Sequence, residues 1–476
     1  MKIHHFFIPL FFIATVSFFF YINGLSFGSL FFSIIFAAIF FYGYKSKQNP
    51  NGIDIFRPYF LTSILLYLYS LSGILFVETT SLNLYGEFVT ERSSIIFVFA
   101  SLLTQLGITI GYVTHKKLFH GSILVKEVNK NNEINYLVFF GILFSIIFFS
   151  YIYKSFLPSE AVSYTEWSLQ SRVDKLSSNT SGLQEIVFTN IPTVLLICAL
   201  IHILFANKYN FLMRFVALIL IVLYLYTQFL SGARASLMIT MLLISVYINY
   251  RVYKFNLAQV IIGGAFVYIL INLISILRLT SNPIEMVYIL SDQLSSSGLA
   301  FLSLQRSGEL LTSLNAITII EGIESGTTTF QSGSLFLNQV LAFIPKFLWP
   351  GRPEFASVLF VQHFYPGIYD IGGGFGFSVV AEGFWEFGLL GCVLYGFITG
   401  FFGERIYQFF MATKHNEVYL FLYALIFSRI VILIHRSGLF SSIKAALIVS
   451  IPIILIILLY QFHKLYKEIN EGTVDS

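Results

Sequence analysis

Two acidic residues lie in an apolar stretch of the C-terminal third of the chain, YDIGGGFGFSVVAEGFWEFGLLG, residues 369–391. Glu382 and Glu386 are four positions apart, so they share one face of a helix. An ionised carboxylate in hydrocarbon is costly unless a partner or water relieves it, and such residues usually serve a function. The pair can divide catalytic work, one accepting a proton and the other orienting arginines, or both can be ion-pair partners of arginines.

Arginine is the residue type that could hold an anion beside these acids. Its planar guanidinium pairs with phosphate through two parallel hydrogen bonds, whereas lysine is a point charge. Each arginine alone fits an anchor at a helix end, but a group of them on one side favours an anionic ligand there. Eight arginines lie in predicted spans or on the predicted outer side: Arg92, Arg172, Arg234, Arg278, Arg306, Arg352, Arg429 and Arg436.

Small residues accompany two of these features. Arg234 lies in SGARAS, residues 231–236, where the flanking side chains leave room for a bulky anion. Gly373 and Gly374 precede a helix start, where free backbone N–H groups can receive phosphate.

Arg429 stands inside an apolar run, one heptad before Arg436, and needs a counter-charge. We expect it to pair with Glu382 or Glu386. Arg436 lies at the mouth of the same run, where it could reach a ligand. His363 and Asp370 are alternative proton acceptors, although each also fits an ordinary loop residue.

These residues belong to a chain whose composition indicates a membrane protein. Of 476 residues, 57% are apolar and 11% are charged, and 54 are phenylalanine. The net charge of +4 is too small, and its basic residues too dispersed, to indicate a nucleic-acid partner. Cys198 and Cys392 lie in predicted spans, so neither a disulfide framework nor a metal cluster is expected. The first apolar run is too long for a signal peptide and is assigned as a span.

The apolar stretches predict about 12 transmembrane helices in an all-α polytopic membrane protein. The distribution of lysine and arginine places both termini in the cytoplasm. The two spans that flank SGARAS fit an outside hairpin or one interrupted helix, and the hairpin is preferred. The predicted spans are 6–22, 25–44, 58–78, 93–114, 135–154, 186–206, 212–230, 235–250, 256–277, 377–402, 417–435 and 441–462.

A large helical outer loop divides the chain. Residues 1–278 hold the first nine spans and a shorter outer loop near 155–185, residues 279–376 form the large loop, and residues 377–476 hold the last three spans and a short cytoplasmic tail. Within the large loop, Asn282-Pro283 is typical of a helix start, and leucines recur at helical spacing from Leu310. We expect amphipathic helices on the outer membrane face, then the proline-broken segment FIPKFLWPGRPEF.

The sequence lacks the motifs that are typical of several kinds of enzyme. It has no Walker-type glycine-lysine loop, no DxD and no HExxH. No predicted strand precedes the GGGFG run, so it is not a dinucleotide fingerprint. ATP-driven chemistry and a metal-nucleotide glycosyltransferase site are therefore not expected. The function classes that remain are chemistry or transport at the outer face of the membrane.

Three segments resemble the O-antigen polymerase family, the Wzy-type oligosaccharide repeat-unit polymerases of bacterial envelopes. They are LSGARAS, PKFLWPGRP and GGGFGFSVVAEGFWEFGLLG, the last at the start of a late span. The resemblance implies a GT-C-like fold in the bacterial inner membrane. It also implies a reaction in which a glycan on undecaprenyl diphosphate is transferred, with inversion or retention, onto the sugar of a new lipid-linked unit.

Such a transfer needs a base for the acceptor hydroxyl and cations for the departing diphosphate. The resemblance thus suggests Glu382 as the base or its orienting group, with Glu386 in support. It implies no metal or other cofactor, and its partners are the lipid-linked oligosaccharide, membrane lipids and a chain-length-regulating co-polymerase. The residues expected around the diphosphate are Arg234, Arg278, Arg352 and Arg436, with Arg429, Gly373 and Gly374 in supporting positions.

Other functions fit parts of the same pattern. A lipid-linked oligosaccharide flippase is also many-spanning with buried charges, but it needs no large outer loop and should show two related halves. An O-antigen ligase has the same chemistry with a lipid A-core acceptor. A non-catalytic assembly scaffold would not need the arginine bias.

Overall fold

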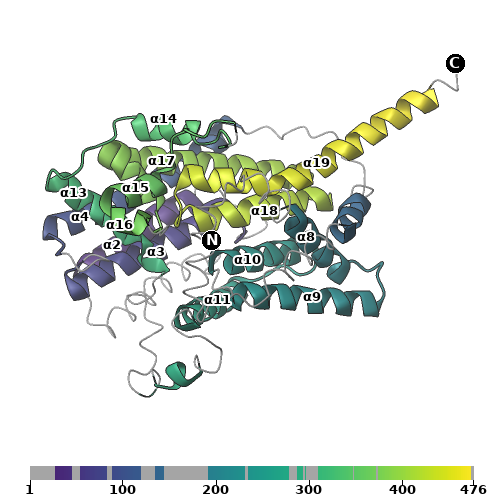
Figure 1. Ribbon diagram of the computed structural model, residues 1–476, viewed down its shortest axis with the longest axis horizontal. Coiled ribbons are helices and arrows are strands. Elements are labelled where there is room, and N and C mark those ends of the chain that lie inside the picture. Colours follow the sequence, from purple (N-terminus) through teal and green to yellow (C-terminus); the bar gives the residue numbers. More distant parts are fainter. Residues whose placement is uncertain are drawn as a thin grey trace.

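The computed structural model describes most of the chain and shows an almost entirely helical protein (Figure 1). Within the described ranges, β-type pairing is limited to two isolated bridges. The all-α prediction is confirmed. The predicted span 6–22, the outer loop near 155–185 and the Asn282-Pro283 helix start lie outside these ranges. The described residues are 27–45, 54–82, 88–119, 134–143, 191–230, 234–277, 287–292, 295, 309–346, 348–370 and 374–472.

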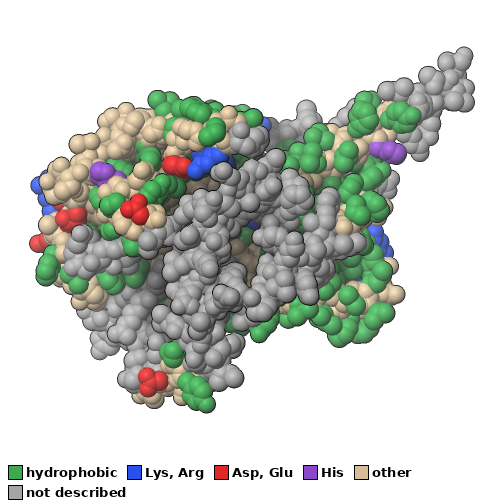
Figure 2. Space-filling model, viewed as in Figure 1, with side chains coloured by type: hydrophobic (Ala, Val, Ile, Leu, Met, Phe, Trp, Pro, Cys, Tyr) green, Lys and Arg blue, Asp and Glu red, His purple; other side chains and the backbone are tan. Residues whose placement is uncertain are grey.

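Six helices in the described part of the chain are long and apolar enough to cross a membrane. Hydrophobic side chains remain exposed along several of them, and in Figure 2 they gather on the right side of the view, over α9 and α19. Such surfaces suit lipid rather than water. The six are α3 (Pro58–Thr80), α4 (Glu91–Leu118), α9 (Phe211–Leu230), α11 (Leu257–Leu277), α17 (Val379–Thr413) and α19 (Leu439–Gly472).

Four further labelled helices coincide with predicted spans, and Ile134–Leu143, in the first part of the predicted span 135–154, is also helical. α9 and α10 are separate helices that contact each other, as expected for a hairpin around SGARAS rather than one interrupted helix. The four are α2 (Phe27–Lys45), α8 (Ile191–Phe205), α10 (Arg234–Arg251) and α18 (Glu417–Leu433).

Glycines allow α4 and α17 to pack with their backbones in close contact. Gly107 and Gly111 are four apart on α4, and Gly396 and Gly400 are four apart on α17. A Cβ built on Gly111 would lie 2.2 Å from the Phe397 carbonyl oxygen. One built on Gly400 would lie 2.0 Å from a carbonyl oxygen of α4. This is the small-xxx-small packing of membrane helices, and it fixes α17 against the rest of the bundle.

α17 contains a sharp reversal of the chain near its start. Phe387 and Gly388 have non-helical backbone angles, and the φ of 62° at Gly388 is one that glycine adopts readily. The residues on either side of the break lie against each other, since a Cβ built on Gly391 would lie 1.9 Å from the Gly383 carbonyl oxygen. The predicted span 377–402 is therefore a short helix that carries Glu382 and Glu386, followed by a long helix.

The described part of the large loop folds against the membrane helices. Its elements gather at one end of α17 (Figure 1), which we call the loop end. Leu310 begins the predicted helical pattern, but the resulting α13 is buried from Leu314 to Ile320 and packs on α4 and α17 instead of presenting one apolar face. The elements are η4 (Leu310–Ser313), α13 (Leu314–Glu324), α14 (Ser334–Leu341), α15 (Ala356–Phe364) and α16 (Pro366–Asp370).

Candidate functional site

The two glutamates that the sequence singles out each bond to the start of another helix. The Glu382 carboxylate accepts the backbone N–H of Leu439, the first residue of α19. The Glu386 carboxylate accepts the backbone N–H of Phe336, in the first turn of α14, at 3.0 Å. Both glutamates are fully buried. Helix N-termini stabilise carboxylates through free N–H groups and the helix dipole, so each acid has a structural role.

A cluster of buried polar groups lies beside the Glu382 carboxyl, whose Oε1 has no hydrogen-bond partner among the described residues. Gln339 of α14 lies against both the Glu382 carboxyl and the Tyr395 hydroxyl. Gly438 leaves space for the acid, because a Cβ built there would lie 2.6 Å from its Oε2. This cluster connects α14, α17 and α19. Proton transfer to Glu382 from a substrate would require the cluster to open, since the residue has no exposed surface.

Arg429 does not pair with either glutamate within the described residues. It lies in α18, where its electrostatic partner is Tyr224 of α9. Its Nε has no hydrogen-bond partner among the residues that the structure describes. The predicted ion pair is therefore wrong. Although Arg429 and Arg436 are one heptad apart, they do not share a helix, because α18 ends at Leu433 and Arg436 lies in the turn that follows.

Arg436 and Arg234, two of the predicted diphosphate ligands, both interact with Tyr69. Both lie within electrostatic range of the Tyr69 hydroxyl, which α3 carries. Arg234 is the first residue of α10, and Arg436 belongs to the turn between α18 and α19. Residues from three distant parts of the chain thus place two guanidinium groups near one hydroxyl.

Glu309 completes this arrangement. Its Oε1 lies 3.1 Å from Arg436 Nε and accepts a hydrogen bond of 3.1 Å from the Tyr69 hydroxyl. Its side chain is 4% exposed, against 24% for Arg436. We call Tyr69, Arg234, Glu309 and Arg436 the Arg436 site. Sequence reasoning missed Glu309 because it belongs to no motif, and its only signal is its place directly before the leucines of η4.

Hydrogen bonds from η4 fix the geometry of the Arg436 site. Ser313 Oγ donates to the Tyr69 carbonyl oxygen at 2.7 Å, and Thr312 Oγ1 donates to the His435 carbonyl oxygen at 3.1 Å. The ring of His435, which is buried, stacks on that of Tyr69 with centroids 5.4 Å apart. These contacts hold the segment that carries Glu309 to both α3 and the turn of Arg436.

The glycine-rich stretch supports the same turn. Phe377 N–H donates to the Arg436 carbonyl oxygen at 2.7 Å, and Val379 N–H donates to the Ile434 carbonyl oxygen at 3.0 Å. Gly376 is needed because a Cβ there would lie 2.2 Å from Thr312 Cγ2. The N–H groups that donate at the start of α17 are thus already engaged, so the expected phosphate contact is not open at these two positions.

The other predicted site residues lie elsewhere. Arg352 stacks over the Phe355 ring at 5.8 Å and interacts with Lys444 of α19, so it belongs to a second basic cluster. His363 of α15 and Asp370 of α16 are exposed, and Gly374 is exposed with open space around it. Arg278 and Gly373 lie outside the described residues.

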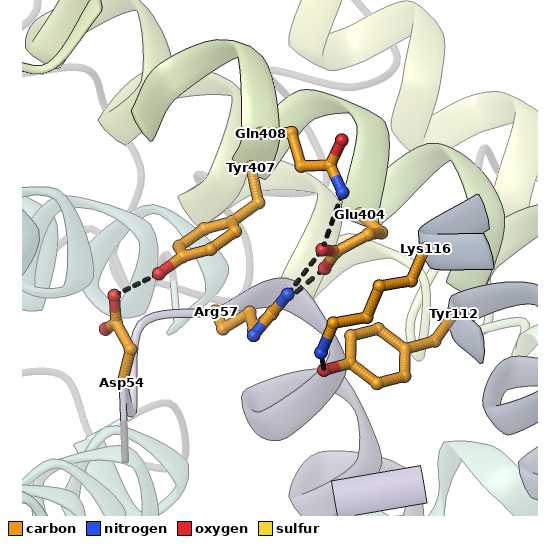
Figure 3. A network of polar contacts seen from close by, with 7 residues as sticks. All are labelled: Asp54, Arg57, Tyr112, Lys116, Glu404, Tyr407 and Gln408. Atoms are coloured by element: carbon orange, nitrogen blue, oxygen red, sulfur yellow. Dashed lines mark hydrogen bonds and ion pairs between the residues drawn. The ribbon is translucent and has the colours of Figure 1, made fainter. Parts of the chain in front are cut away.

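A second polar network lies at the opposite end of α17 from Glu382 (Figure 3). Arg57, which directly precedes α3, forms a two-bond ion pair with Glu404, with Nε and Oε2 2.8 Å apart. The Arg57 guanidinium also stacks on the rings of Tyr112 and Tyr407, at 4.9 and 4.7 Å. Asp54 accepts hydrogen bonds from the hydroxyls of Tyr407 and Tyr250. No sequence pattern indicated the pair of Arg57 and Glu404, which are 347 positions apart.

Comparison of the chain with known protein families, with curated proteins and with solved structures found no match.

Proposed function

We propose that this protein polymerises undecaprenyl-diphosphate-linked oligosaccharide repeat units at the outer face of the bacterial inner membrane, as an O-antigen polymerase-like glycosyltransferase. The Arg436 site is the observation that carries the proposal. It combines two arginines, a carboxylate and a tyrosine hydroxyl contributed by α3, α10, the segment before η4 and the turn after α18. The proposal includes the twelve predicted spans, a GT-C-like arrangement and cytoplasmic termini.

Two of the family-like sequence segments converge on this site, which supports the proposal. LSGARAS carries Arg234, and GGGFGF carries Gly376 and Phe377, which contact η4 and the turn of Arg436. Arginines can stabilise a departing diphosphate without a metal ion, because each offers charged N–H groups in a fixed fork. The resemblance and the geometry therefore favour the same chemistry at the same place.

A deletion strain distinguishes this function from the alternatives. Loss of a polymerase leaves single repeat units attached to their final carrier. Loss of a ligase leaves long chains that remain on the lipid diphosphate, and loss of a flippase leaves lipid-linked units on the cytoplasmic side. We expect the first pattern, and either of the others would contradict the proposal.

Replacing Arg436 by Lys should lower the rate of polymerisation about tenfold, because hydrogen bonds to charged groups contribute about 1.5–3 kcal/mol and lysine loses the guanidinium fork. Polymer ladders from cells that express equal amounts of protein measure the effect. The matched control is Arg92→Lys, since Arg92 pairs with Glu324 at 2.8 Å but has a side chain that is 82% exposed. Equal ladders from both variants would show that Arg436 is only an anchor.

Glu382→Gln separates the two roles of the buried acid. Loss of a catalytic base would lower the rate about 10²–10⁴-fold, whereas loss of a charge at a helix N-terminus lowers stability by about 0.3–1 kcal/mol. Because the carboxylate bonds to α19 and has no exposed surface, we expect reduced thermal stability with transfer retained. Lost transfer at unchanged stability would restore Glu382 as the base.

A further inference from the structure

Among the described residues of the Arg436 site, the one carboxylate is that of Glu309, and it forms an ion pair with Arg436. Glu309 Oε1 lies 3.1 Å from Arg436 Nε and accepts the Tyr69 hydroxyl at the same distance. The partner on the solvent side is Arg436, whose side chain is 24% exposed, whereas that of Glu309 is 4% exposed. One guanidinium nitrogen, Arg436 Nη1, is buried with no hydrogen-bond partner among the described residues. The arginine thus keeps donor capacity while it covers the acid.

A phosphate oxygen and the Glu309 carboxylate would compete for the same guanidinium group. Both are anionic acceptors, and phosphate matches the arginine fork through two hydrogen bonds. Arg234 adds a second positive charge near Tyr69, so the site as a whole attracts an anion. A diphosphate that binds Arg436 and Arg234 would therefore weaken the hold of Arg436 on Glu309.

We propose that Glu309 is the general base of the transfer, and that it becomes available when a phosphate oxygen of the donor replaces it at Arg436. The inference rests on the proposed function and adds a residue and an order of events to it. Binding of the lipid diphosphate comes first, and it prepares the acid that the reaction needs.

The chemical step balances without any further reactant. The acceptor hydroxyl gives its proton to a carboxylate oxygen of Glu309 while its oxygen forms a bond to the anomeric carbon of the donor. The bond between that carbon and the phosphate oxygen breaks, and the diphosphate leaves with the electron pair. Arg436 and Arg234 stabilise the negative charge that develops on it. Tyr69 keeps its hydrogen bond to Glu309 and so orients the carboxylate.

The position of Glu309 suits this role better than that of Glu382. Glu382 has no exposed surface and bonds to the start of α19. Glu309 instead pairs with Arg436 and accepts the hydroxyl of Tyr69, which lies within electrostatic range of both Arg436 and Arg234. Hydrogen bonds from Thr312 and Ser313 fix the segment that follows it. A base must lie within hydrogen-bond reach of the proton it removes, which requires it to be near the reacting phosphate ester.

The test measures glycan transfer and pyrophosphate binding on the same purified full-length variants. We expect E309Q to lower transfer about 10²–10⁴-fold, as for loss of a general base. The same variant should bind inorganic pyrophosphate more tightly, because the carboxylate that competes for Arg436 is gone. We expect at least about a fivefold gain in affinity, which is the lower end of typical coupling between two binding events. Binding is read from the pyrophosphate-dependent rise in unfolding temperature. A purely structural role of Glu309 would weaken binding instead.

The matched control is Glu324→Gln, which removes a carboxylate that also pairs with an arginine, Arg92, in the same folded segment. It should change neither measurement. If E309Q does not fold, E309D keeps the charge and should still lose transfer about 10²-fold, because a displacement of about 1 Å can have that effect.

Each other outcome overturns a defined part of the proposal. Normal transfer by E309Q would remove the base role, and weaker pyrophosphate binding would remove the exchange at Arg436. If even the unmodified protein transfers no glycan while E309Q binds pyrophosphate more tightly, the polymerase function and the base role both fail and only the ion-pair exchange remains.

Discussion

Replacing Glu404 by Gln should lower the free energy of unfolding by about 3–5 kcal/mol, the cost of leaving one member of a buried ion pair without its partner. Glu404 is 1% exposed, and both of its oxygens bond to Arg57, whose side chain is 12% exposed. The neutral amide would leave the Arg57 charge with two aromatic rings but no counter-charge (Figure 3). SDS-titration unfolding in mixed micelles measures the change.

The matched control for this variant is Glu354→Gln. Glu354 pairs with Lys346 at 2.6 Å, but the two side chains are 27% and 58% exposed. An exposed ion pair contributes about 0.2–1 kcal/mol, so this change should have little effect on unfolding. If both variants lose the same small amount, the Arg57–Glu404 pair does not secure the contact between α3 and α17.

Replacing Gly400 by Leu should lower the free energy of unfolding by about 3 kcal/mol, the upper end of the range for overpacked cores. Even a Cβ at this position would lie 2.0 Å from the Ile108 carbonyl oxygen, and a helix backbone cannot give way as a side chain can. α4 and α17 would have to move apart. The loss of their small-residue contact should then also displace the short helix that carries Glu382.

The matched control for the packing prediction is Gly263→Leu. Gly263 lies inside α11, and a Cβ built there would meet nothing within 4 Å. Because glycine has a low helix propensity, this change should leave stability unchanged or raise it by up to about 1 kcal/mol. A lower free energy of unfolding for Gly400→Leu and an equal or higher one for Gly263→Leu would confirm that the close approach to Ile108 decides the outcome. A Gly400→Leu protein of unchanged stability would contradict it.

The membrane helices could be predicted because each depends on a local run of residues. The apolar stretches that became α3, α9 and α11 are long enough to span a bilayer, and nothing in them interrupts a helix. α17 was harder, because the sequence FGLLG continues an apolar run through the break. Only the backbone shows that Gly388 turns the chain there.

The contacts within the candidate site could not be predicted from the local sequence pattern. Arg234 and Arg436 could be singled out from the sequence, since the bias of arginine over lysine is visible in composition, and both lie within electrostatic range of Tyr69. Glu309 could not be, because Tyr69 lies 240 positions before it and no spacing rule relates residues on different helices. The same reason hid the partners of Glu382 and Arg57.

The most direct test of the proposed function is glycan transfer by the purified protein in proteoliposomes supplied with undecaprenyl-diphosphate-linked repeat units. The proposal predicts a ladder of lipid-linked oligomers that grows by one repeat unit per step, and predicts that the ladder shortens with Arg436→Lys but not with Arg92→Lys. Repeat units that keep their original length with active, folded protein present would contradict the polymerase function.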